Sequence, residues 1–125
     1  MGNTFPSSVE SDEEIVNLLV DMGVSRKTAK TLTYLSHVDN CISKTIEEET
    51  RLRQPEVSTA LKELRGRGWI EKEDIKKEGK GRPIHSYRMV IPFDRAIKTL
   101  VKEKKSEIQE MQNTLKRLKE IVGTD

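Results

Sequence analysis

The 125-residue sequence has few cysteine, histidine and aromatic residues, and these shortages exclude several classes of protein. Its single cysteine, Cys41, cannot form an internal disulfide bond, which is typical of proteins from a reducing cytoplasm. No apolar run approaches the roughly 20 residues that a membrane span needs. Met1–Glu10 lacks the basic and apolar regions of a signal peptide. We therefore expect a cytoplasmic protein without membrane contact.

Sequence patterns for catalysis and cofactor binding are also missing. The two histidines, His37 and His85, belong to no nucleophile or acid–base motif, and Gly79–Gly81 lacks the strand-then-helix setting of a phosphate-binding loop. His37 and Cys41 lie four residues apart, but one imidazole and one thiol are an incomplete ligand set for zinc. The sequence predicts a protein that is not an enzyme and holds no metal or cofactor, with metal or redox sensing as an alternative.

Charge is plentiful and unevenly distributed along the chain. Residues 1–50 contain four Lys or Arg against nine Asp or Glu, whereas residues 51–88 contain eleven against six. The net charge of +2 therefore conceals an acidic first segment and a basic middle segment. A basic segment of this kind is typical of a surface that meets a polyanion, although a solvated surface rich in Lys and Glu would give the same counts.

Apolar periodicity predicts a mainly α-helical chain with a small antiparallel β-hairpin. The first helix is expected to be capped by Ser11 and to end at Gly23, with an apolar stripe formed by Ile15, Leu18, Leu19 and Met22. Ser25 and Ser43 would cap the second and third helices, and Cys41-Ile42 would form a short strand or a linker. The later elements are expected as a helix at 54–65, strands at 69–72 and 85–91, and a helix at 94–122.

Residues 43–65 form two short helical patterns joined by a tight turn at Thr50–Arg53. The second pattern would bury Val57, Ala60, Leu61 and Leu64 and leave a slim polar face outward. That face suits a helix that enters the DNA major groove, because short hydroxyl side chains allow close approach and longer ones reach bases or phosphates. The candidate DNA-binding residues on it are Gln54, Ser58, Thr59, Lys62 and Arg65. An ordinary amphipathic surface helix would show a similar pattern.

The loop between the two predicted strands is rich in glycine and in cations. Lys76, Lys77, Lys80 and Arg82 lie within eight residues, and the glycines permit close approach to another backbone. Such a loop fits DNA phosphates or the narrow minor groove, whereas a solvated hairpin tip would also favour lysine and glycine. A helix followed by this basic loop is more specific than either feature alone.

The last predicted helix has apolar residues at alternating spacings of three and four, interrupted by Lys104. This heptad pattern is typical of a coiled coil, so we expect the helix to pair with that of a second copy. The candidate dimerisation residues are Ile97, Val101, Ile108, Met111, Leu115, Leu118 and Val122. A helix that folds back on its own domain is the alternative.

Several of these segments together resemble the archaeal TrmB-like and ArsR-like winged-helix regulators, which are related to the MarR group. The resemblance is carried by Met22–Ser25 with Ala29, Ile46–Thr50, Val57–Leu64, Gly68–Ile70, Gly81–Pro83 and Tyr87. It implies that Ser58, Thr59 and Lys62 lie on the recognition helix and that Arg82 lies at the wing tip. The turn carries Arg51 where many such units carry glycine, and the sugar-binding domain of larger TrmB-like proteins is expected to be absent or on a partner.

The sequence therefore predicts a winged helix-turn-helix fold in three regions. We expect a disordered tail at 1–10, a DNA-binding domain at 11–91 and a dimerisation helix at 92–125. The expected function is sequence-specific binding of double-stranded DNA by a homodimeric transcriptional regulator, whose effector the sequence does not specify. The alternative is a winged helix that binds protein within a larger assembly, in which case Trp69 would be part of the contact surface.

Overall fold

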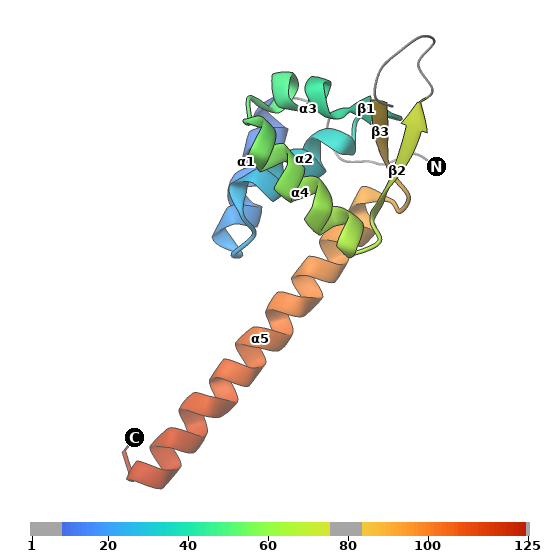
Figure 1. Ribbon diagram of the computed structural model, residues 1–125. Helices are drawn as coiled ribbons and strands as arrows, with labels where there is room; N and C mark the ends of the chain where they lie inside the picture. The colour runs from blue at the N-terminus through green and yellow to red at the C-terminus, as the bar shows by residue number, and fades with distance from the viewer. Residues whose placement is uncertain (1–8, 76–83, 125) are drawn as a thin grey trace. The chain divides into compact units, whose positions relative to one another are not determined.

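The computed structural model describes residues 9–75 and 84–124, so most of the tail predicted at 1–10 lies outside the described residues. It confirms the predicted fold class, because the chain is mainly helical with one small antiparallel sheet (Figure 1). The chain forms two compact units, one ending at Phe93 and the other beginning at Asp94. The helices are α1 (Val9–Asp21), α2 (Arg26–Leu35), α3 (Ser43–Thr50), α4 (Gln54–Gly66) and α5 (Phe93–Val122); the strands are β1 (Cys41–Ile42), β2 (Ile70–Ile75) and β3 (Ile84–Met89).

Helix α1 differs from its prediction at its start and in one apolar position. It begins at Val9, so Ser11 lies inside the first turn instead of capping it. Leu18, predicted to be part of the apolar stripe, is 56% exposed, while Val16 and Leu19 are buried. Because successive residues are about 100° apart around a helix, a face centred on Val16 and Leu19 turns Leu18 outward. The predicted stop is confirmed: Gly23 has a φ of 104°, and the Val24 N–H donates to Leu19 O at 3.0 Å.

Helix α2 forms the centre of the first unit. Ala29, Leu32 and Leu35 are almost completely buried, as their spacing predicts. The helix packs against α1 and against α4, so it links the N-terminal helix to the helix-turn-helix pair. Ser25 is the residue before the helix, as expected, but its hydroxyl donates to Thr28 Oγ1 at 2.9 Å and not to the backbone.

The sheet has three strands, one more than the predicted hairpin, in the order β1-β3-β2. Strand β1 pairs with β3 through Cys41 and Tyr87, which confirms the strand alternative for Cys41-Ile42. In the hairpin, β2 runs on to Ile75 and β3 ends at Met89, so the bounds of each strand differ from its prediction by one to three residues. Cross-strand polar contacts support this register, because Glu71 of β2 forms an ion pair with Arg88 of β3, and Asp74 of β2 forms a hydrogen bond with His85 of β3.

Helix α5 is 30 residues long and ends at Val122, as predicted. It begins at Phe93, so Asp94 lies in the first turn and not at the cap, where its charge still favours the positive end of the helix dipole. Gly123, with a φ of 78°, closes the last turn by donating its N–H to Lys119 O at 2.8 Å. Within residues 9–75 and 84–124, no helix combines the length and the apolar character that a membrane crossing requires.

Candidate nucleic-acid interface

Helices α3 and α4 form the predicted helix-turn-helix pair within the first unit. Ile46 of α3 is fully buried, and Thr50 closes the helix by donating its hydroxyl to Ile46 O at 2.5 Å. Arg51 then takes a left-handed backbone, with φ of 59° and ψ of 30°. Lys30 of α2 donates from Nζ to Thr50 O at 3.4 Å, directly before this turn. The turn thus has the geometry that glycine commonly supplies, but here an arginine adopts it.

The start of α4 is held by its own first turn. Arg53 has an extended backbone, and its N–H donates to Glu56 Oε1 at 2.9 Å, which is one half of a capping box. Pro55 lies in the first turn, where its missing N–H costs no hydrogen bond. The chain leaves α4 at Gly66, and Gly68, with a φ of 76°, directs it into Trp69 and β2. Both ends of the helix are therefore defined by backbone features.

Helix α4 separates its buried and exposed residues as the sequence predicts. Val57, Ala60, Leu61 and Leu64 are at most 3% exposed, and they pack the helix on α2 and α3. The predicted DNA-binding residues of this helix are all exposed: Gln54, Ser58, Thr59, Lys62 and Arg65. At about 100° per residue, Thr59 and Lys62 lie opposite the buried stripe, with Ser58 beside them. A firmly seated helix thus presents small polar side chains and cations outward.

Thr59 makes a hydrogen bond that bears on what it could recognise. Its hydroxyl donates to Pro55 O at 2.9 Å, one turn earlier in α4. The hydroxyl proton is therefore engaged, while the oxygen can still accept a hydrogen bond and the side chain as a whole is exposed. Such a threonine can accept a hydrogen bond from a base amino group, or contact a thymine methyl group.

The predicted wing is described only at its base. Lys76, Lys77, Lys80 and Arg82 lie outside the described residues. The strands below them are joined by the ion pair between Arg88 and Glu71, and by a 2.6 Å contact between His85 Nδ1 and Asp74 Oδ1. The paired strands β2 and β3 therefore lead directly into and out of the predicted basic loop.

Trp69 is not available as the contact residue that the protein-binding alternative requires. Its side chain is only 7% exposed, and the Arg67 guanidinium lies over the ring, 4.7 Å from its centroid. The cation covers the aromatic face, so the indole contributes to the domain core and not to a surface. Sequence reasoning missed this pairing, although the Arg-Gly-Trp order at 67–69 could have suggested it.

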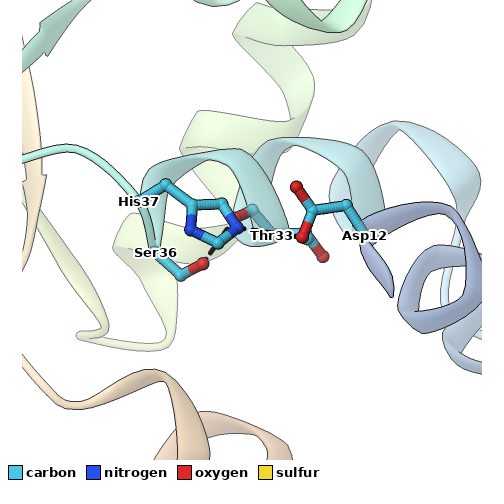
Figure 2. Close-up of polar contacts among 4 residues, drawn as sticks. All are labelled: Asp12, Thr33, Ser36 and His37. Atoms are coloured by element: carbon cyan, nitrogen blue, oxygen red, sulfur yellow. Dashed lines mark hydrogen bonds and ion pairs between the residues drawn. The ribbon is translucent and has the colours of Figure 1, made fainter. Parts of the chain in front are cut away.

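The histidine and cysteine of the metal- or redox-sensing alternative have different partners. His37 Nε2 lies 2.9 Å from Asp12 Oδ1 and so connects the end of α2 to α1, while the neighbouring Ser36 hydroxyl donates to Thr33 O (Figure 2). Cys41 Sγ instead lies 3.8 Å from the Tyr34 hydroxyl. In the described part of the chain, no three His, Cys, Asp or Glu side chains are grouped as metal ligands.

Burial also lowers the reactivity of Cys41. Desolvation raises the pKa of the Cys41 thiol, although the hydrogen bond with Tyr34 opposes this rise. A thiol with a raised pKa stays protonated near neutral pH, and only the thiolate is a good nucleophile or metal ligand. The same surroundings, mainly through desolvation, raise the pKa of Tyr34 to about 12. These properties disfavour Cys41 as a redox sensor.

Comparison with known proteins agrees with this geometry. Residues 22–81 match the MarR family, whereas no curated protein matches the chain. Among solved structures, TrmBL2, described as an archaeal chromatin protein, is 18% identical with a TM-score of 0.62. That match covers 90% of this chain but 40% of TrmBL2, so the chain spans less than half of that protein.

Two further structures match over most of both chains. A possible transcriptional regulator from Methanosarcina mazei Go1 is 11% identical with a TM-score of 0.61, over 94% of this chain and 96% of its own. A MarR-family transcriptional regulator from Silicibacter pomeroyi is 21% identical with a TM-score of 0.52, over 89% and 79%. At these identities the structural matches show the fold, while the MarR match agrees with the predicted absence of enzymatic activity. The chain therefore has the winged helix-turn-helix fold, and its residues 22–81, just under half of the sequence, match the MarR family.

Proposed function

We propose that this protein is a transcription regulator that binds specific sequences in double-stranded DNA as a homodimer, with α4 reading bases in the major groove. The basic loop at residues 76–83 would bind phosphates or the minor groove beside it. A protein that acts on chromosomal DNA in this way would work in the cytoplasm. TrmBL2 is described as binding DNA in a novel mode, which supports the same class of ligand here.

The exposed face of α4 carries this proposal. Ser58 and Thr59 are short enough to let the helix backbone approach base edges, and Lys62 next to them can reach a base or a phosphate. Gln54 at the N-terminal end can pair with adenine through two hydrogen bonds, while Arg65 near the other end suits a phosphate. The buried stripe of α4 supports specific reading, because a helix fixed on a packed core holds its outward side chains at defined positions.

The cations of the loop would add affinity that is independent of sequence. Lys76, Lys77, Lys80 and Arg82 give four positive charges, and each phosphate that they neutralise releases counterions from the DNA. This part of the proposal depends on the sequence and on the paired strands below the loop. It predicts a steep loss of affinity as salt rises.

The proposal of a homodimer is supported by the apolar stripe of α5. Its large apolar side chains are 51–66% exposed over the last four turns: Ile108, Met111, Leu115, Leu118, Ile121 and Val122. Ile97 and Val101, the first two positions of the same heptad pattern, are partly buried. An apolar face of this length on a charged helix, interrupted by Lys104, is stabilised when a second copy covers it. Two-fold pairing would also present two α4 helices to a palindromic site.

Selection of protein-bound fragments from a random duplex pool would test the proposal. We expect enrichment of a pseudo-palindrome whose half-sites are about one or two helical turns apart. A salt titration of the selected site should give a slope of log K against log salt of roughly −4 to −5 per domain, if about four to six phosphates are neutralised. An unenriched pool together with salt-insensitive binding would contradict the proposal.

A further inference from the structure

Arg51 is the only residue other than glycine with a positive φ in the part of the chain that the structure describes. Its φ of 59° and ψ of 30° lie in the left-handed helical region, where the Cβ atom of an L-residue is crowded by backbone. Glycine adopts this conformation without that crowding, and asparagine tolerates it better than most residues. An arginine at this position therefore makes the turn between α3 and α4 less stable than glycine would.

The local fold gives no reason for the arginine side chain. The hydrogen bonds at this turn use other residues: Thr50 Oγ1 to Ile46 O, Lys30 Nζ to Thr50 O, and Arg53 N–H to Glu56. Arg51 itself is exposed, and among residues 9–75 and 84–124 no carboxylate lies within ion-pair distance of its guanidinium. In the described part of the chain, this residue thus adds strain to the turn while its side chain makes no hydrogen bond or ion pair.

We propose that Arg51 is a DNA phosphate-binding residue, and that the strained turn is retained because this guanidinium is needed on DNA. The inference rests on the proposed function, since it assumes that α4 enters the major groove. Arg51 lies three residues before Gln54, the first residue of α4, on the short turn that leads into that helix. When α4 enters a groove, the turn before it comes close to the sugar–phosphate backbone at the groove edge. A planar guanidinium can bind two phosphate oxygens at once. Glycine has no side chain that could make this contact.

Strain that remains at an exposed residue without internal partners is typical of functional positions. Two opposite effects of one substitution follow from this reasoning. Arg51→Gly should stabilise the free protein, because it removes the crowded Cβ atom, and it should weaken DNA binding, because it removes the cation. If Arg51 had a purely structural role, Arg51→Gly would instead lower the stability of the protein and leave the salt dependence of DNA binding unchanged.

The experiment compares the full-length wild type with Arg51→Gly, Arg51→Asn and Arg51→Lys. Thermal denaturation should show a higher midpoint for the glycine variant, by roughly 3–6 °C, a smaller rise for asparagine, and none for lysine. Fluorescence anisotropy with a labelled random-sequence duplex should show a roughly 5- to 30-fold weaker Kd for glycine and asparagine. The slope of log K against log salt should fall by about 1 for these two variants and stay near the wild-type value for lysine.

Lys102→Gln, which removes one exposed cation from α5, is the matched control and should leave the salt slope unchanged. Equal affinity and equal salt slope for wild type and Arg51→Gly would overturn the inference while leaving the proposed function intact. A lower denaturation midpoint for both Arg51→Gly and Arg51→Asn would also overturn it, because the arginine would then stabilise the turn. Absence of salt-dependent DNA binding by the wild type would instead contradict the proposed function itself.

Discussion

The substitution Leu115→Glu should convert the proposed dimer into a monomer. Leu115 is 51% exposed in the single chain, near the middle of the apolar stripe of α5. Burying a whole leucine side chain contributes about 1.5–3 kcal/mol, so covering the exposed half contributes about 0.75–1.5 kcal/mol in each copy. The loss over two copies is then about 1.5–3 kcal/mol. Two glutamates that face each other across the seam add repulsion and desolvation of at least about 1 kcal/mol.

A total loss of roughly 2.5–4 kcal/mol would weaken dimerisation by about two to three orders of magnitude. Multi-angle light scattering at micromolar concentration should therefore give a dimer for the wild type and a monomer for Leu115→Glu. Ser106→Glu is a control with the same charge change, since Ser106 is exposed and lies outside the heptad stripe, so this variant should stay dimeric. A monomeric wild type, or a Leu115→Glu variant that remains fully dimeric, would refute the coiled-coil reasoning.

Three further predictions concern the proposed DNA-binding residues and Tyr34, which is partly buried. Thr59→Val keeps the shape of the side chain but removes the accepting oxygen. In competition binding, discrimination between the selected site and random DNA should therefore fall by about 1–3 kcal/mol, while the affinity for random DNA stays unchanged. Equal losses of affinity on both DNAs would contradict base reading by Thr59. The double variant Lys80→Ala/Arg82→Ala should weaken binding to all sequences alike and reduce the salt slope by about 2, and an unchanged slope would remove the loop from the mechanism. In a Tyr87→Phe background, absorbance titration should give a pKa of about 12 for Tyr34 in the folded chain and the ordinary value of 10 in urea. Because the folded state then keeps its proton longer than the unfolded state, stability should fall as pH rises from 10 to 12, whereas identical folded and unfolded titrations would disprove the shift.

Short-range patterns in the sequence determined the elements on which the function depends. Val57, Ala60, Leu61 and Leu64 recur at helical spacing, so α4 and its buried face follow from periodicity, and the outward residues follow by exclusion. The stop at Gly23 and the helix end at Val122 were likewise predictable, because left-handed glycines close helices through local hydrogen bonds. The roles of the outward residues and of the α5 stripe stay predictions, since they depend on DNA and on a second copy.

Tertiary structure alone decided the features that depend on residues far apart in the chain. Periodicity assigned Leu18 to the apolar stripe of α1 and did not include Val16, whereas in the packed structure Val16 is buried and Leu18 is exposed. The two-residue strand Cys41–Ile42 exists because β3, more than forty residues later, supplies its hydrogen-bonding partner, and no local pattern specifies that pairing. The left-handed backbone of Arg51 also depends on tertiary packing, because α3 and α4 both pack on the core and Arg51 lies in the short turn between them. An arginine outside such a context disfavours this conformation.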